Sequence, residues 1–311
     1  MHTVLKQIEE AGPILNVKHD VADQLTAASI PLGSINSIIW SHHHVDHTGD
    51  PSLFPKSTSL IVGPGFRAEK TTYPGYPLNP DAVVCQDAFE GRELIELDFT
   101  ESMLKIGDFS AVDFFGDGSF YILHAPGHSK NYRICTIPLL IDMKAYDHLN
   151  ALARTSKDKF VFLGGDSVQH CGELRPSSLL PLPDSITPSP FDSLSSCGVC
   201  PGSLFESIHP TAVNSTGDYK TTPFYELPTH MSIDLPEVVK TVSKIQVFDA
   251  SSDVLVVFAH DESLVDILPI FPGGELTGWE KTNYKTLGTW RFLKDFKVVE
   301  AKQGEGGQQT T

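Results

Sequence analysis

The segment from Ser41 to Asp50 constrains the fold of this chain more than any other feature. It places four histidines and an aspartate within six positions, directly after the short apolar run 35–40. Neutral imidazole and carboxylate are the ligands that first-row divalent metals, zinc above all, prefer. A chain that leaves a strand and turns at residues 48–50 can point alternate side chains at one spot. The alternatives are a solvated polar loop or a remnant of a His-rich tract, but such tracts are usually terminal and repetitive. The segment therefore predicts a metal site at the end of a strand.

Ligand-type side chains follow three further apolar runs that are typical of buried strands. In chain order they are His124 and His128, Asp166, and His260. Active-site residues commonly lie just past a strand, because the scaffold is rigid there and the loop lets a side chain face a cleft. Four such strand ends in one chain predict that these residues meet in a single centre.

The remaining pattern predicts mixed sheets covered by helices. A Gly-Asp-Gly turn at 116–118 lies between two apolar runs and predicts a hairpin. Helical spacing occurs at 2–11, 19–29, 236–247 and again after Asp261. Strands are expected at 35–40, 58–62, 93–97, 111–115, 119–124, 160–163 and 254–259.

Composition limits the partners of the chain. The 311 residues carry 23 basic and 39 acidic side chains, a net charge of −16, and no basic cluster of the kind that nucleic acid requires. No stretch reaches the length of a membrane span, and the N-terminus lacks the apolar core of a signal peptide. Five cysteines are a sparse, odd set. We expect a cytoplasmic protein that acts on a small molecule, without nucleic-acid or membrane partners.

One domain is expected over residues 1–300, followed by a disordered tail at 301–311. Within it, residues 175–228 are rich in proline and serine. A loop of this length is usually a lid or a binding surface, and its apolar residues favour a cover over a pocket. An ordered surface wrap without function is the equal alternative. The CxxC spacing of Cys197 and Cys200 has no second pair to complete a zinc site, so we interpret it as two incidental thiols.

The pattern His42-x-His44-x-Asp46-His47, with His128, Asp166 and His260 in that order, resembles the metallo-β-lactamase-fold hydrolase superfamily. The strings WSHHHVDHTGDP (40–51), GPGF (63–66) and FVFLGGD (160–166) more narrowly resemble its lactonase-like branch, including fungal members. The similarity extends from about residue 14 to about residue 295. It implies an α+β fold, a four-layer αββα sandwich, with a dinuclear metal site at one edge.

The resemblance also implies the ligands: His42, His44 and His128 for the first ion, Asp46, His47 and His260 for the second, and Asp166 between them. Two divalent ions per chain, with zinc the first candidate, would activate water to a metal-bound hydroxide that attacks a carbonyl carbon. Asp46 is the expected proton shuttle. We expect a metal-dependent hydrolase that opens a lactone. A thioesterase, an amide or β-lactam hydrolase, and a catalytically impaired metal-binding homologue are the alternatives.

The other histidines receive more modest interpretations. His43 points away from its neighbours in an extended segment, which predicts either packing or support of a metal ligand from behind, and His124 is expected to be structural. His170 is a candidate for the pocket rim, against an alternative with no role in the site. Surface or loop positions are expected for His2, His19, His209 and His230.

Two departures from the family pattern lead to hypotheses. Relatives begin with strands before the first helix, whereas this chain starts at what reads as that helix, so we expect the first strands to be missing or the sequence to be a fragment. In addition, residues 130–146 interrupt a join between Gly-His128-Ser and Asp147-His148 that the family pattern would make almost directly. We interpret this insert as translated intron or a gene-model error, which sequencing of the transcript would test.

Overall fold

A computed structural model of the chain describes residues 17–128, 148–191, 198–211, 217–227 and 234–296. The predicted helix at 2–11, the insert at 130–146, the tail at 301–311 and Cys197 lie outside the described residues.

The described strands form two main sheets and one small strand pair. The smaller main sheet is parallel, in the order β1 (Ser37–Ile39), β2 (Ser59–Val62) and β3 (Leu94–Glu96). The larger has the order β11-β8-β7-β6-β5-β4. Its strands are β4 (Lys105–Ile106), β5 (Phe109–Asp113), β6 (Phe120–His124), β7 (Leu149–Ser156), β8 (Lys159–Leu163) and β11 (Val254–Val257). Only β8 and β11 pair in parallel in this sheet. The small pair is β9 (Ser185–Ile186) with β10 (Cys200–Pro201).

Helices in the described ranges are mostly short. The α-helices are α2 (Val21–Ala27), α3 (Val45–Thr48), α5 (Leu235–Ala250) and α6 (Tyr284–Thr289). The 3-10 turns are η1 (Leu32–Ser34), η2 (Pro51–Leu53), η3 (Gln86–Ala88), η4 (Cys171–Glu173), η5 (Gly202–Ile208), η6 (Glu262–Leu264), η7 (Trp279–Lys281) and η8 (Arg291–Asp295). The candidate centre therefore depends on strand ends and short turns for its geometry.

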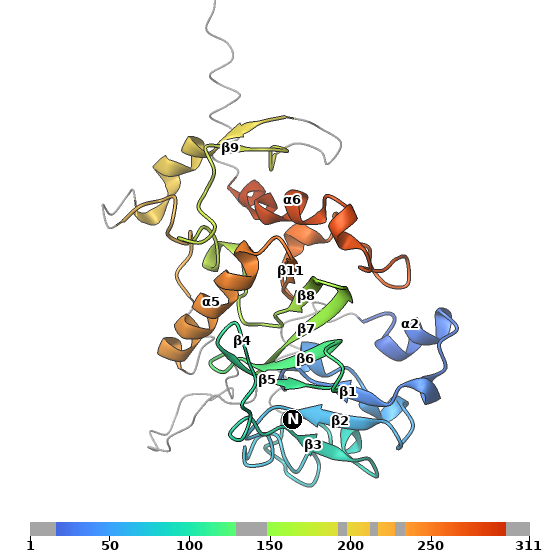
Figure 1. Cartoon of the computed structure of the whole chain (residues 1–311). Coiled ribbons are helices and arrows are strands. Elements are labelled where there is room, and N and C mark those ends of the chain that lie inside the picture. Colours follow the sequence, from blue (N-terminus) through green and yellow to red (C-terminus); the bar gives the residue numbers. More distant parts are fainter. Residues whose placement is uncertain (1–16, 129–147, 192–197, 212–216, 228–233, 297–311) are drawn as a thin grey trace, which may run out of the picture.

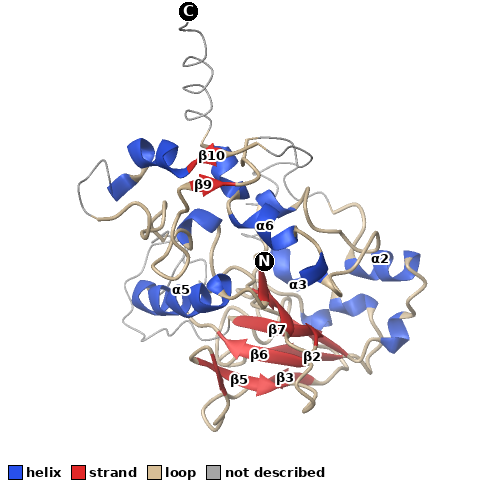
Figure 2. Cartoon of the chain, turned by 45° about the horizontal axis from the view of Figure 1, so that its top comes forward, coloured by secondary structure: helices blue, strands red, loops and turns tan. Residues whose placement is uncertain are grey.

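The long helix α5 covers one face of the large sheet (Figures 1 and 2). Asp234 caps its N-terminus by accepting a hydrogen bond from the Glu237 amide, and a proline occupies its first turn. The apolar residues Val238, Val242 and Ile245 recur at helical spacing and are buried. They pack with large-sheet residues in the main core, so the face of this sheet behind the candidate centre is closed.

The layers are separated by distinct apolar clusters. Phe99, Ile122 and Leu149 fill the space between the two sheets. Trp40 and Phe66 belong to another cluster on the outer face of the small sheet, which lies at the bottom of Figure 1. Short turns and irregular chain, rather than a long helix, cover that face in the described part of the chain. The order helix, sheet, sheet, helical turns confirms the predicted αββα sandwich.

All seven predicted strands and the hairpin are confirmed, with ends shifted by at most two residues. The hairpin turn is held by Asp113, whose carboxylate accepts hydrogen bonds from the amides of Gly116 and Gly118. Both glycines adopt positive φ, of 72° and 75°, which glycine adopts without strain. Strand β7 was not predicted, because its sequence LNALARTS lacks an apolar alternation.

The described part of residues 175–228 contributes to the main core, and the role of this region as a cover stays a prediction. Phe205 and Phe224 are fully buried there, and Cys200 is buried beside them. Residues from both halves of the chain therefore share one core.

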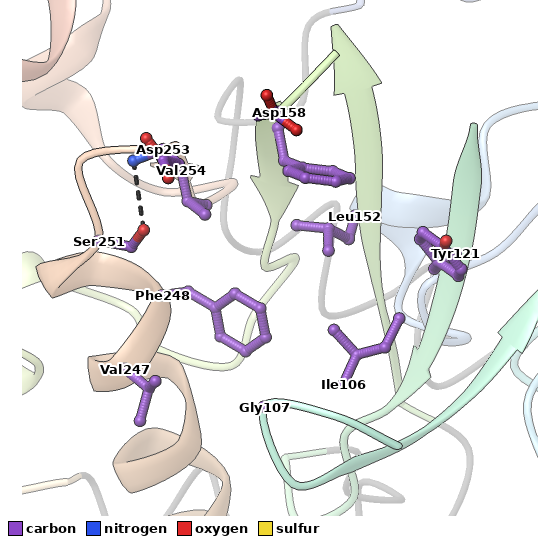
Figure 3. A pocket seen from close by; sticks show the side chains of 11 residues that line it. Ile106, Gly107, Tyr121, Leu152, Asp158, Val247, Phe248, Ser251, Asp253 and Val254 are labelled. Atoms are coloured by element: carbon purple, nitrogen blue, oxygen red, sulfur yellow. Dashed lines mark hydrogen bonds between the residues drawn. The ribbon is translucent and has the colours of Figure 1, made fainter. Parts of the chain in front are cut away.

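A cavity of about 530 Å³ lies between the end of α5 and the large sheet. Figure 3 shows Phe248 pointing toward Ile106 and Leu152 across it. Val254, the first residue of β11, also lines the cavity, whereas the last residue of that strand leads toward His260. The cavity is therefore at the opposite end of the sheet from the predicted metal ligands. No helix among the described residues is long and apolar enough to cross a membrane.

Candidate metal centre

Seven predicted ligand residues converge at one end of the two sheets. Those that follow strands come from β1, β6, β8 and β11, and the rest belong to α3, for which His44 is the N-cap residue. They form two groups, and within each group the ligand atoms all lie within 4.8 Å of one another. One group is His42, His44, His128 and Asp166, and the other is Asp46, His47, Asp166 and His260. This division is the one that the resemblance implies.

Asp166 belongs to both groups because its two carboxylate oxygens face different histidines. Oδ2 lies 3.3 Å from Nε2 of His128 and 3.8 Å from Nε2 of His42. Oδ1 lies 3.0 Å from Nε2 of His47 and 3.2 Å from Nε2 of His260. A single carboxylate therefore faces both histidine groups.

The buried polar atoms of the centre fit a metal site. Nε2 of His42, His47 and His128 and Oδ1 of Asp166 are buried, and within the described residues these atoms face one another without a well-formed hydrogen bond. Buried polar atoms are otherwise almost always paired, because an unpaired one costs free energy. Imidazole nitrogen and carboxylate oxygen that converge in this way match the donor set of zinc and similar divalent ions.

The two groups differ in exposure. The side chains of His42 and His128 are 0% and 6% exposed, whereas those of Asp46 and His260 are 40% and 42% exposed. We call the first set (His42, His44, His128) the buried half and the second set (Asp46, His47, His260) the open half. The open half is therefore the side of the centre that faces solvent.

Protonation in the metal-free chain differs between the halves as well. Burial, together with the neighbouring rings of His148 and His44, holds the pKa of His42 far below its ordinary value. Burial alone would raise the pKa of Asp166, but His128 and His47 lower it well below its ordinary value. His42 therefore presents a neutral imidazole beside the ionised carboxylate of Asp166, and these are the forms of the two groups that bind a metal.

In the open half, His47 behaves in the opposite way. Burial alone would lower the pKa of His47, but the nearby carboxylates of Asp166 and Asp46 outweigh it and raise the pKa to about 9. His47 also lowers the pKa of Asp46, whose Oδ2 is 3.2 Å from its Nε2. Without a metal, His47 is protonated at neutral pH and must lose that proton when an ion binds.

Contacts behind the histidine segment fix its path. The indole nitrogen of Trp40 donates a hydrogen bond to the Thr48 carbonyl at 2.8 Å, across the turn that carries Asp46 and His47. The amide of Leu149, at the start of β7, donates to the Ser41 carbonyl at 2.7 Å. The small sheet and the large sheet therefore both hold the segment in place.

The other histidines fall outside the two groups. His43 is buried, and His124 stacks on Phe99 with ring centroids 5.0 Å apart, in line with structural roles. His170 lies 3.1 Å from Asp295 through Nε2 and is not brought into either group. His209 lies in a loop just after η5, as one of the two alternatives predicted, but it is fully buried there.

Sequence reasoning missed His148, which is fully buried beside the centre. Its ring centroid is 5.1 Å from that of His42 and 5.6 Å from that of His128. The signal was a histidine directly before a strand, but the strand itself was not predicted.

The chain is similar to several fungal enzymes. It is 40% identical over 303 residues to a gamma-lactamase of Fusarium pseudograminearum, covering 96% of this chain and 67% of that protein. It is 40% identical to a metallo-hydrolase of Annulohypoxylon moriforme, covering 99% of this chain and 76% of that protein. A gamma-lactamase of Gibberella moniliformis is 46% identical over 67% of this chain and 80% of its own length.

No protein-family model matches the chain. The fungal similarity covers nearly the whole sequence, and the structure has the sandwich and the clustered His and Asp side chains that such hydrolases require. The chain therefore belongs to the metallo-β-lactamase-fold hydrolases, in the lactonase-like branch with these fungal relatives, and is a metal-dependent enzyme.

Proposed function

We propose that this enzyme is a dinuclear hydrolase that opens a small cyclic ester or amide, a lactone or the corresponding lactam. The observation that carries the proposal is the division of the two Asp166 oxygens between the two histidine groups. An arrangement with one shared carboxylate serves two ions, and pairs of ions are suited to hydrolysis of carbonyl compounds. Zinc is the ion that the donor set favours first.

The seven residues have separate tasks in this proposal. The buried half would hold one ion and the open half would hold the other. Asp166 would contribute to the binding of both. When bound, such ions supply Lewis acidity at a carbonyl oxygen and lower the pKa of water toward about 7. Asp46 directs Oδ2 toward His47 and His260, which leaves Oδ1 to accept a proton and pass it to the departing oxygen or nitrogen.

The ring class of the substrate rests on different support. A lactone is expected from the resemblance of the sequence motifs, and a γ-lactam from the names of two fungal relatives. The two rings share the carbonyl that is attacked and differ in the leaving atom, so one site accommodates both by moving the same proton to oxygen or nitrogen. A net charge of −16 supports a neutral or weakly charged substrate.

The expected compartment is the cytoplasm. The odd, sparse set of five cysteines supports a reducing environment.

A hydrolysis screen tests the proposal. The zinc-loaded chain would be given lactones, γ-lactams, β-lactams and thioesters, with and without a chelator, beside an Asp166→Asn variant. We expect turnover of a cyclic ester or amide that the chelator abolishes and added zinc restores. Turnover that persists in the chelated protein, or a chain that takes up no metal, would contradict the proposal.

A further inference from the structure

The turn that carries Asp166 is held from the start of strand β7. His148 directly precedes this strand and Asn150 lies two residues further on, so the two side chains emerge on the same face. Nε2 of His148 accepts a hydrogen bond from the Asp166 amide at 3.2 Å. Oδ1 of Asn150 accepts one from the Ser167 hydroxyl at 3.0 Å. Both acceptor residues are buried, and they hold two successive residues of the turn, Asp166 and Ser167.

The first of these contacts has a consequence for the ring of His148. A nitrogen that accepts a hydrogen bond carries no proton, so the ring is neutral, its proton is on Nδ1, and the Nε2 lone pair is directed at the Asp166 amide. His148 therefore does not act as a further ligand through Nε2. Among the described residues it also belongs to neither ligand group, although its ring lies 5.1 Å from that of His42.

Gly165 allows this close approach. It adopts a φ of +48°, and a Cβ at this position would lie 3.1 Å from Nε2 of His148 and 3.3 Å from Cβ of Ser41. A side chain would therefore be strained and would press on the imidazole. The backbone before Asp166 thus has the conformation and the space that the hydrogen bond requires.

We infer that His148 is a positioning residue for the metal centre: it fixes the backbone of Asp166 and thereby directs one carboxylate oxygen to each half. This inference rests on the proposed dinuclear site. Asp166 is 3% exposed, so loss of the acceptor leaves its amide buried without a partner. The turn then relaxes, and the shared carboxylate no longer meets both halves. Partners that orient metal ligands typically change metal affinity 10- to 100-fold when they are removed.

Three substitutions at His148 separate positioning from simple packing. His148→Gln places an amide oxygen near the position of Nε2 and keeps an acceptor, His148→Asn is too short to reach, and His148→Leu removes the acceptor. Binding of Co²⁺ alone would be followed by its visible absorption and by competition with a chelating dye, with unfolding measured in parallel. His124→Leu is the matched control, because His124 also lies at a strand end but packs on Phe99.

We expect the original chain to bind two Co²⁺ ions. The Co²⁺ affinity of His148→Gln and of the control should lie within about threefold of that of the original chain. In His148→Asn and His148→Leu the Co²⁺ affinity should fall by about 10- to 100-fold, with an altered absorption spectrum. Equal behaviour of the Gln and Asn variants would overturn the inference, as would an unchanged spectrum in a folded Leu variant. If His148→Leu does not fold, the Gln and Asn pair decides. A failure of the original chain to bind Co²⁺ would instead contradict the proposed function.

Discussion

The buried and open halves of the candidate centre use the same side chains in different surroundings. His128 is 6% exposed, whereas the side chain of His260 is 42% exposed, yet both lie within 3.3 Å of Asp166 through Nε2. The chain keeps His42 neutral by burial and keeps His47 protonated by two carboxylates. Surroundings, rather than ligand type, therefore distinguish the halves.

This difference gives the two halves separate roles in our account. In the buried half, His42 is already neutral and, like His128, is shielded from solvent, so we expect this half to fill first and to hold its ion more tightly. The open half must release a proton and faces the solvent, so we expect it to bind the more weakly held ion and to meet the substrate. The cavity at the opposite end of the large sheet takes no part in this arrangement.

The largest effect is expected at the residue that joins the halves. Asp166→Asn keeps the size of the side chain but removes the charge that both halves share. We expect fewer than two ions per chain by mass spectrometry and a rate of hydrolysis lower by about 10³-fold or more. The control is Asp158→Asn, an exposed carboxylate at the distant cavity, for which both values should not change. A fully loaded Asp166→Asn protein would contradict the shared role.

Substitutions of one ligand in each half should separate them. We expect His128→Gln to weaken metal binding by about 100-fold and to lower the Tm of the loaded protein, because the ligand is buried. We expect His260→Gln to weaken binding by only about tenfold, with a smaller change in Tm. Isothermal titration measures the metal affinity of each variant, and thermal unfolding measures its Tm. Equal losses in the two variants would remove the distinction between the halves.

The open half should also depend on pH. The pKa of His47 is raised from 6.5 to about 9 in the metal-free chain. A raised pKa in the folded state contributes stability that is fully present below pH 6.5 and is lost as the pH rises through about 9. The free energy of unfolding of the metal-free protein should therefore fall over this range, while affinity for the second ion rises.

Denaturant titrations and metal titrations at several pH values test both slopes. His47→Gln is the control, and we expect it to remove the contribution of this proton from the pH dependence of both the free energy of unfolding and the affinity for the second ion. An affinity for the second ion that does not change below pH 9 would contradict the assignment of the proton to His47.

A smaller effect is expected from the support behind the open half. Trp40→Phe keeps an aromatic ring in its cluster but removes the hydrogen bond to Thr48. We expect a loss of about 1 kcal/mol in the free energy of unfolding. The affinity for the second ion should fall a few-fold, while the affinity for the first ion should not change. A lower affinity for the first ion, with the second unaffected, would contradict the assignment of this turn to the open half.

The smallest effect is expected from deletion of residues 130–146. The amide of Ala125 donates to the carbonyl of His148 at 3.0 Å, so the described flanks of this segment already pair as the ends of a hairpin. Joining Ser129 to Asp147 would leave a connection of five residues, a common hairpin length. We expect metal content, Tm and rate to be retained in the deletion variant, as the hypothesis of a translated intron requires. Loss of metal binding would show that the segment is needed.

The sequence predicted the parts of the molecule that depend on local pattern. Apolar runs that end in His or Asp identified most strands that carry the centre, because a buried strand must be apolar whatever surrounds it. It did not predict β7, whose sequence LNALARTS lacks an apolar alternation, and so it missed the role of His148. The exposure of each half also escaped prediction, since the solvent access of Asp46 and His260 depends on how distant segments pack. Phe205 and Phe224 enter the main core for the same reason.

The most direct test of the account is a crystal structure of the zinc-loaded protein with anomalous diffraction measured at the zinc edge. We predict two anomalous peaks, one at His42, His44 and His128 and the other at Asp46, His47 and His260, with Asp166 between them and the higher occupancy in the buried half. A single peak, or two peaks without Asp166 between them, would contradict the account.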